Sequence, residues 1–281
     1  MGDLDGRTFL ITGANTGIGR ETARALAARD ARVYIAVRSE ANGRRAIDEI
    51  AARTGNRTNL ELLSLDLGDL DSVRRCAEAF LATDEPLHVL INNAGLAGAK
   101  GTTASGFEIA FGTNHVGPFL FTALLLDRLR SSAPARIVNV ASIAHYDAPG
   151  IDWEAVRRPT RSFTGMREYR VSKLANVLHA RELAGRLKGS GVSTYSLHPG
   201  VIASDIWRRV PWPLRPLMKR RMGTTEQGAR TSIYCATSDE VADQTGRYYD
   251  DCRPREPAAS VTDTLAAELW RRSCEWTGVG A

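Results

Sequence analysis

Short apolar runs alternate with longer amphipathic stretches along most of the chain. Each short run is typical of a strand buried in a sheet, and strands are expected at 8–12, 33–37, 60–64, 87–92, 136–140 and 192–196. Between them, apolar residues recur at helical spacing and predict helices at 17–29, 42–53, 70–81, 107–129 and 167–187. A terminal helix is expected at 262–276, with Leu265, Leu269 and Trp276 facing inward.

This alternation of strand and helix predicts the fold class. Strand–helix–strand units connect parallel strands, and their helices cover both faces of the sheet. We therefore expect an α/β fold with a doubly wound parallel sheet of the Rossmann type. The sequence contains no repeat, low-complexity tract or linker, so residues 1–281 are interpreted as a single domain.

The composition narrows the class of protein. The 281 residues are 43% hydrophobic and 25% charged, which is ordinary for a soluble globular protein with a sizeable core. The net charge of +5 is spread along the chain, so it favours anionic ligands only weakly and does not indicate nucleic acid. The four cysteines form no CxxC motif, and no signal peptide or bilayer-spanning stretch is evident. We expect a cytoplasmic protein with no membrane span.

A glycine-rich turn joins the first expected strand to the first helix. Glycine lets the backbone turn tightly and approach a phosphate closely, and a helix N-terminus offers N–H donors to a pyrophosphate. A tight turn without a ligand would need the same glycines, but the strand before and the helix after favour a dinucleotide. The loop residues assigned to the cofactor are Gly13, Asn15, Thr16, Gly17, Ile18 and Gly19.

The residue after the second expected strand helps to distinguish an NAD site from an NADP site. An NAD-binding site commonly has an acidic residue there, which bonds the ribose 2′-hydroxyl. This chain has Arg38, whose guanidinium suits a 2′-phosphate, although a solvated surface arginine is the alternative. We therefore expect NADP rather than NAD.

The residues after the other strands form a second group of candidates. In a doubly wound sheet, ligands bind beyond the carboxyl ends of the strands. Asp66 could accept from an adenine amino group or cap the next helix, and Asn114 is a poor helix former at a place that suits a local distortion. The others in this group are Leu67, Asn93, Ala94, Gly95, Ser142, Pro199 and Gly200.

Tyr169 and Lys173 lie four residues apart in the helix expected at 167–187. At that spacing the two side chains project from one face, one turn apart. A nearby cation favours the phenolate, so the pair could exchange a proton with an alcohol or carbonyl. An ordinary amphipathic helix surface is the alternative for the pair alone.

Together these motifs resemble the short-chain dehydrogenase/reductase family in its compact form. The resemblance covers about residues 5–249 and rests on Thr12-Gly13-x-x-x-Gly17-Ile18-Gly19, Asn92-Asn93-Ala94-Gly95, Ser142, Tyr169-x-x-x-Lys173 and Pro199-Gly200. Finer features are similar to the retinol dehydrogenase-like branch, among them Asn114-His115-Val116-Gly117-Pro118-Phe119-Leu120. Members of that branch often begin with an apolar membrane anchor, which this sequence lacks, and their second strand commonly ends Ala-Cys-Arg where this chain has Ala36-Val37-Arg38.

The resemblance implies a catalytic tetrad of Asn114, Ser142, Tyr169 and Lys173, with no metal. In this scheme Tyr169 exchanges the proton, Ser142 bonds the substrate oxygen, and Lys173 lowers the phenol pKa and bonds the nicotinamide ribose. Asn114 holds a water that links Lys173 to solvent. Tyr169 and Lys173 thereby also contact the cofactor. The family commonly forms a homodimer or homotetramer through its fourth and fifth helices.

The expected function is NADP(H)-dependent interconversion of an alcohol and a ketone or aldehyde on a small lipophilic substrate. A non-catalytic NADP-sensing or scaffold protein of the same fold is the main alternative. The chain is short for the extended-type epimerases and dehydratases, whose glycine spacing differs. Ser142, His145 and Asp147 are too close in sequence to make a hydrolase triad readily, and the histidines lack metal-ligand spacing.

The segment at about 201–223 is interpreted as a substrate lid, because it follows Pro199-Gly200. Its basic residues and tryptophans leave two alternatives open, a patch that touches an anionic membrane and a solvated surface loop.

Overall fold

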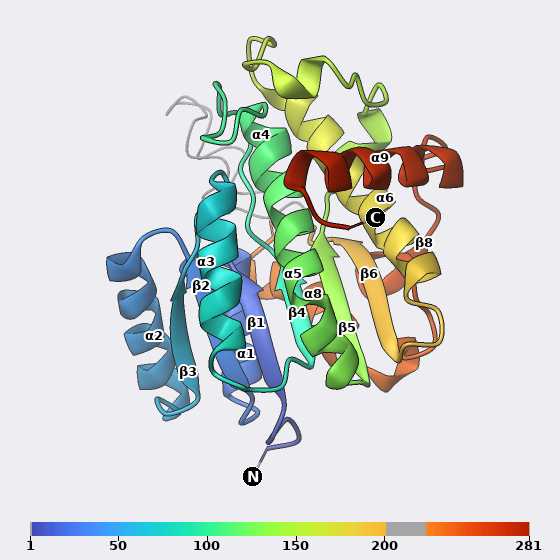
Figure 1. The fold of residues 1–281 in the computed structure, drawn as a ribbon. Helices are drawn as coiled ribbons and strands as arrows, with labels where there is room; N and C mark the ends of the chain where they lie inside the picture. Colours follow the sequence, from blue (N-terminus) through green and yellow to red (C-terminus); the bar gives the residue numbers. More distant parts are fainter. Residues whose placement is uncertain (1, 201–222, 281) are drawn as a thin grey trace.

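The computed structural model describes residues 2–200 and 223–280, and these form one eight-stranded sheet flanked by helices (Figure 1). The sheet order is β3-β2-β1-β4-β5-β6-β7-β8, and neighbouring strands are parallel except β7 and β8. The strands are β1 (Thr8–Thr12), β2 (Arg32–Val37), β3 (Leu60–Ser64), β4 (Val89–Asn92), β5 (Ala135–Val140), β6 (Val192–His198), β7 (Tyr248–Asp250) and β8 (Arg253–Arg255). All six predicted strands are confirmed, and so is the α/β class.

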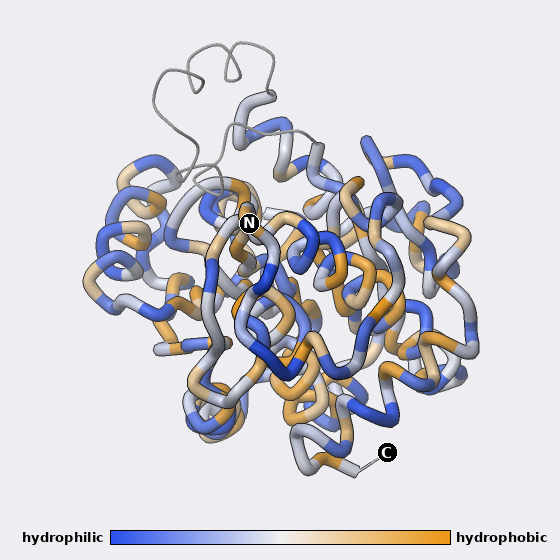
Figure 2. The backbone as a smooth tube through the Cα atoms, turned by 90° about the horizontal axis from the view of Figure 1, so that it is seen from above, coloured by the Kyte–Doolittle hydropathy of each residue, from blue (hydrophilic) through white to orange (hydrophobic). Residues whose placement is uncertain are grey.

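Helices cover both faces of this sheet. One face carries α1 (Gly17–Ala27), α2 (Glu40–Thr54) and α8 (Thr225–Thr237), and the other carries α3 (Leu70–Leu81), α5 (Gly117–Ser131) and α6 (Met166–Arg186) (Figure 1). Successive strand residues point to opposite faces, so Phe9 and Ile11 enter one core while Leu10 enters the other. Seen from above, hydrophobic and hydrophilic positions alternate along the peripheral helices, as expected for helices that pack one side on a sheet (Figure 2).

The direction of strand addition reverses at β1. The chain builds from β1 through β2 to β3 on one side, then returns to place β4 on the other side of β1. Loops after β1 and β4 therefore leave the sheet in opposite directions and open a crevice at its carboxyl edge. This crevice is where the predicted glycine turn and Asn93 both lie.

The helix predicted at 107–129 is interrupted. It consists of α4 (Ile109–Phe111), a π-helical turn at Gly112–Val116, and α5. Asn114 lies in the turn, which agrees with the distortion expected around it. π-helical turns are frequent at functional sites because they redirect side chains.

This helical run also corrects the expectation that no stretch could span a bilayer. Ile109–Ser131 is long and apolar enough to do so, with a mean hydropathy of 1.4. However, 72% of its apolar window is buried inside the fold, between the sheet and other helices. Its hydrophobicity is therefore accounted for by the protein core.

The terminal helix α9 (Asp263–Thr277) lies across α6 and the start of α5 (Figure 1). Leu269 is buried, and Leu265 and Trp276 pack on the same apolar cluster, as the sequence predicts. Trp270 meets Phe119 of α5 edge to face, with 5.0 Å between ring centroids. The chain's own C-terminal helix thus packs on α6 and on the start of α5.

Two histidines are buried beneath α9. The rings of His115 and His179 lie 5.8 Å apart, and His115 Nε2 is 3.0 Å from Ser273 Oγ of α9. Burial lowers the pKa of His179 to about 3, and burial, followed by the proximity of His179, lowers the pKa of His115 far below its usual value. Both rings are therefore neutral in the folded protein at neutral pH.

We predict that this pair makes the fold acid-sensitive. Since the unfolded chain takes up protons near pH 6.5 and the folded state does not, stability is full above about pH 6.5 and falls as the pH drops below it. Each histidine should contribute about 1.4 kcal/mol per pH unit. The free energy of unfolding, measured by denaturant titration, should be plotted against pH between about 4.5 and 6.5. Its slope should be about 1.4 kcal/mol per pH unit shallower in His179→Leu than in the unchanged protein. An unchanged slope would contradict the burial of a neutral ring.

Candidate active site

The glycine turn after β1 has no room for side chains. Gly13 and Gly17 have φ angles of 69° and 58°, which L-residues rarely adopt. A Cβ at Gly13 would lie 2.9 Å from Ala94 Cα, and one at Gly19 would lie 2.7 Å from Gly13 O and collide with the Asn93 amide. The half-buried Asn15, Thr16 and Ile18 complete the turn. A side chain at Gly13 or Gly19 would therefore push the turn away from the loop after β4.

Hydrogen bonds of Asn93 and Ala94 join the loop after β4 to the end of β1. Asn93 Nδ2 donates to Thr12 O at 2.8 Å, and the backbone N–H groups of Asn93 and Ala94 donate to Thr12 Oγ1 at 3.1 and 3.0 Å. These bonds join residues more than eighty positions apart in sequence. They fix the loop after β4 against the end of β1, at the point where the sheet order reverses.

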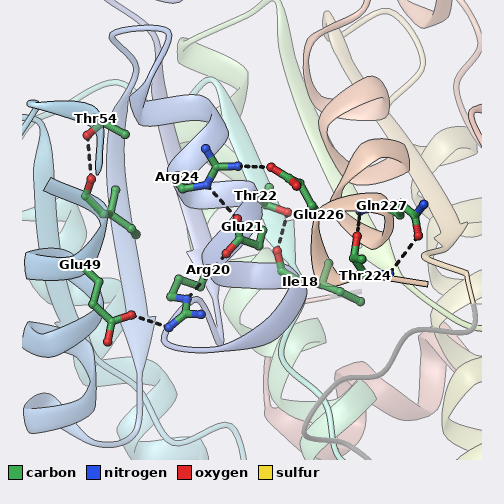
Figure 3. Close-up of polar contacts among 11 residues, drawn as sticks. Ile18, Arg20, Glu21, Thr22, Arg24, Glu49, Thr54, Thr224, Glu226 and Gln227 are labelled. Carbon is green, nitrogen blue, oxygen red and sulfur yellow. Dashed lines mark hydrogen bonds and ion pairs between the residues drawn. The ribbon is translucent and has the colours of Figure 1, made fainter. Parts of the chain in front are cut away.

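Ion pairs join α1, the helix that starts in the glycine turn, to its neighbours α2 and α8. Arg24 of α1 bonds Glu21 one turn earlier and Glu226 of α8, both at 2.8 Å (Figure 3). Arg20 pairs with Glu49 of α2 (Figure 3). The first turn of α1 contains no acidic residue, so the positive end of its dipole is not neutralised there. This end of the helix suits a diphosphate.

Arg38 and Asp66 meet at the carboxyl ends of β2 and β3. Arg38 Nη1 is 4.0 Å from Asp66 Oδ2, and the Arg38 side chain is 80% exposed. Such a long, exposed pair leaves the guanidinium free to bond another anion. The alternative that Asp66 caps the next helix is wrong: Asp69 caps α3, and Asp66 Oδ1 accepts from Gly68 N at 2.9 Å. Leu67 is buried beside them.

Tyr169 and Lys173 are both buried on one face of α6, with 8% and 3% of their surfaces exposed. Lys173 Nζ donates to the Val140 carbonyl at 2.7 Å and lies 5.8 Å from the centre of the tyrosine ring. Burial lowers the lysine pKa to about 8. The ammonium is therefore held between the end of β5 and the phenol.

The phenol of Tyr169 has a raised pKa, contrary to the expectation that Lys173 would lower it. Burial is the main cause, and a side-chain interaction with Ser142 opposes it. The sequence argument considered only the cation and not the loss of water around the phenol. At neutral pH, Tyr169 therefore carries its proton and is ready to donate it.

Asn114 links the loop after β4 to the helix of the tyrosine. Its Oδ1 accepts from Leu96 N at 2.9 Å, and its Nδ2 donates to Leu96 O at 3.0 Å and to Ser172 Oγ at 2.9 Å. Ser172 in turn donates to the Tyr169 carbonyl at 2.8 Å. Both N–H groups of the amide are used, and Oδ1 retains one acceptor position for the water that the family resemblance implies.

Ser142 directly follows β5 and begins the 3₁₀ turn at Ile143–Asp147. Its hydroxyl accepts from Ala144 N at 3.2 Å and interacts with Tyr169. A Cβ at Gly95 would lie 3.3 Å from Asn114 Oδ1 and 3.4 Å from Lys173 Nζ, so this glycine borders the same cluster. Pro199 and Gly200 are half-buried after β6, at the same edge of the sheet.

The four predicted catalytic residues thus gather from three elements at one edge of the sheet: the π-helical turn, the 3₁₀ turn after β5, and α6. The predicted lid at 201–223 lies, except for Gly223, outside the described residues. Among residues 2–200 and 223–280, no group of three or more potential ligands could hold a metal ion. Ser172 was missed by the sequence reasoning; a serine three residues after Tyr169 in a helix, able to bond its carbonyl, was the available signal.

Residues 7–155 match the family model described as short chain dehydrogenase. Retinol dehydrogenase 12 from Homo sapiens is 46% identical, in an alignment that covers 98% of this chain and 88% of that protein. Retinol dehydrogenase 11 from Homo sapiens is 44% identical, with 98% and 87% covered.

Solved structures show the same fold. A crystal structure of an uncharacterized protein from Mycobacterium Paratuberculosis superposes with a TM-score of 0.79 at 33% identity, and 99% of this chain and 96% of that chain are covered. The actinorhodin polyketide ketoreductase with NADPH has a TM-score of 0.68 at 23% identity, with 89% and 97% covered, which shows the fold alone. The crevice, the buried tyrosine and lysine, and these similarities lead to one conclusion: the chain belongs to the short-chain dehydrogenase/reductase family, in its retinol dehydrogenase-like branch, and is an oxidoreductase of alcohols and carbonyls.

Proposed function

We propose that this protein is an NADP(H)-dependent oxidoreductase that interconverts an alcohol and a ketone or aldehyde on a lipophilic substrate. The observation that carries the proposal is the buried Tyr169–Lys173 pair beside Ser142, at the same edge of the sheet as a glycine turn that packs closely on the loop after β4. A proton donor is thus available where a flat dinucleotide would fit.

The residues around the crevice fit a dinucleotide phosphate. The glycine turn and the N-terminus of α1 would hold the diphosphate, and Arg38 would pair with a 2′-phosphate. Asp66 and Leu67 would border the adenine. The residues that would border the nicotinamide and its ribose are Asn93, Ala94, Gly95, Tyr169, Lys173, Pro199 and Gly200. When bound, the cofactor supplies or accepts the hydride at the substrate carbon.

The chain's own residues move the proton. In reduction, the protonated Tyr169 donates to the substrate oxygen as negative charge develops there, and the Ser142 hydroxyl donates a second hydrogen bond to the same atom. Lys173 then stabilises the phenolate electrostatically, because its ammonium is buried nearby. Asn114 orders the surrounding backbone and would hold the water through which the proton is replaced.

Two observations support a lipophilic substrate. Ile143 directly follows Ser142 and Tyr146 lies in the same 3₁₀ turn, and the two are 50% and 45% exposed, which is unusual for large apolar side chains. They offer an apolar surface on the turn that carries the serine. The names of the two human relatives specify retinol, a long apolar alcohol.

A substrate screen tests this function. Retinal, steroids, and aliphatic and aromatic carbonyls should be offered with NADPH, and the loss of its absorbance followed. We expect turnover of long apolar carbonyls and little of short polar ones. Binding of NADPH without turnover of any carbonyl would favour the alternative, a cofactor-sensing or scaffold protein of the same fold.

The cellular setting and assembly are also proposals. All four cysteines are free thiols, which suits the reducing cytoplasm. Helix α9 packs on α6 and on the start of α5, the two helices through which the family commonly associates. We propose a homodimer or homotetramer in which α9 lies beside that interface.

A further inference from the structure

We propose that His145 is a positioning residue, which orients Ser142 for catalysis by tying it to the C-terminal part of the chain. This inference rests on the proposed function, since Ser142 is taken to bond the substrate oxygen. His145 itself does not reach the reacting atoms. Its imidazole lies in the turn that begins at the serine, three residues further along.

The two ring nitrogens of His145 have different partners. Nδ1 lies 2.8 Å from the Ser142 carbonyl oxygen, and Nε2 lies 3.1 Å from the backbone nitrogen of Ala258. A backbone N–H can only donate and a carbonyl can only accept. Nε2 must therefore be the unprotonated acceptor, and Nδ1 must carry the hydrogen that is donated to Ser142. The contacts define a single neutral tautomer.

Aromatic packing also holds the imidazole ring of His145 in place. His145 is fully buried and packs against Tyr146 and Tyr248, with ring centroids 4.1 and 4.7 Å away. Tyr146 donates from its hydroxyl to the Glu256 carbonyl, two residues before Ala258. The segment from β7 to Ala258 thus closes over the turn and holds the imidazole in one orientation.

These contacts fix the peptide group that follows Ser142. The Ser142 backbone is extended, and it is the last residue before the chain enters the 3₁₀ turn. Its carbonyl accepts from both the His145 ring and the His145 backbone N–H. Rotation of this peptide would change where the Ser142 hydroxyl points. The imidazole restricts that rotation, so the hydroxyl stays next to Tyr169.

Two substitutions test the two hydrogen bonds of the His145 ring separately. An asparagine can place an amide N–H near the position of Nδ1, whereas a glutamine can place an oxygen near that of Nε2. His145→Asn should keep the bond to Ser142, and His145→Gln should keep the bond to Ala258. Both remove the stacking on the tyrosines, so each is the stability control for the other.

We expect His145→Gln to lower kcat about tenfold and His145→Asn to lower it by less than about threefold. Neither should change the NADPH dissociation constant measured by fluorescence. In a Ser142→Ala background, His145→Gln should lower kcat no further, because the histidine acts through the serine. An equal loss in both backgrounds, or losses that follow only the melting temperature, would overturn the proposal.

A measurement without turnover tests the tautomer. Nitrogen-15 NMR of histidine-labelled protein near neutral pH should show His145 protonated at Nδ1 alone, and a ring protonated at Nε2 would overturn the proposal. Tyr169→Phe is assayed in parallel. If that variant stays active, the proposed function fails; if it is inactive while His145→Gln matches the unchanged protein, only the positioning role fails.

Discussion

Tyr169→Phe is expected to lower kcat by about 10³-fold while the NADPH dissociation constant stays within about twofold. The substitution removes one oxygen and with it the only group that we assign to donate the proton to the substrate. Burial raises the pKa of this phenol, so in the unchanged protein the donor is in its protonated form at neutral pH. The buried ring itself is retained.

Retention of the ring makes this variant informative. NADPH fluorescence titration and thermal unfolding report on the crevice and the fold, and both should be nearly unchanged. Phe163→Ala is a matched control, since that ring is 89% exposed and lies outside the assigned site. Turnover by Tyr169→Phe close to that of the unchanged protein would show that another group donates the proton.

Arg38→Asp is expected to reverse the cofactor preference. Loss of the guanidinium should weaken NADPH binding about ten- to a hundredfold, because a charge-assisted contact contributes about 1.5–3 kcal/mol. The new carboxylate should repel a 2′-phosphate and accept from a 2′-hydroxyl, which strengthens NADH binding. Within residues 2–200 and 223–280, the ion pair of Arg38 is the long contact to Asp66, so little of the fold depends on it.

The measurement is a titration of both cofactors against both proteins. Arg53→Asp is the charge-matched control, because Arg53 is exposed at the opposite end of α2 from Arg38 and should leave the preference unchanged. Equal selectivity for NADPH in the Arg38 variant would contradict the assignment of NADP. It would leave the proton chemistry of Tyr169 untouched.

Much of the sheet was predictable because β1 to β6 are local apolar runs. β7 and β8 were not, since each has three residues and β8 reads Arg253-Pro254-Arg255, a charged edge strand that contains proline. Helix α8 lacks a clear apolar period, and it owes its start to a capping box at Thr224 and Gln227. The π-helical turn was anticipated only as a distortion near Asn114.

The candidate site was also predictable only in part. Residues after parallel strands were predictable as a group, because the carboxyl ends of such strands meet at one edge. The bonds that orient them join distant positions, such as Asn93 to Thr12 and His145 to Ala258, and no local pattern reveals those partners. The direction of the Tyr169 pKa was mispredicted because it depends on burial, which the spacing of two side chains does not report.

The central claim is that a hydride and the proton of Tyr169 are delivered to one carbonyl in this crevice. Reduction of retinal with NADPH that carries deuterium at the transferable position of C4, followed by mass spectrometry, tests it most directly. We predict an alcohol with one deuterium on the carbinol carbon from the unchanged protein, and no alcohol from Tyr169→Phe. Bound NADPH that transfers no deuterium to retinal or to any carbonyl in the screen would contradict the account.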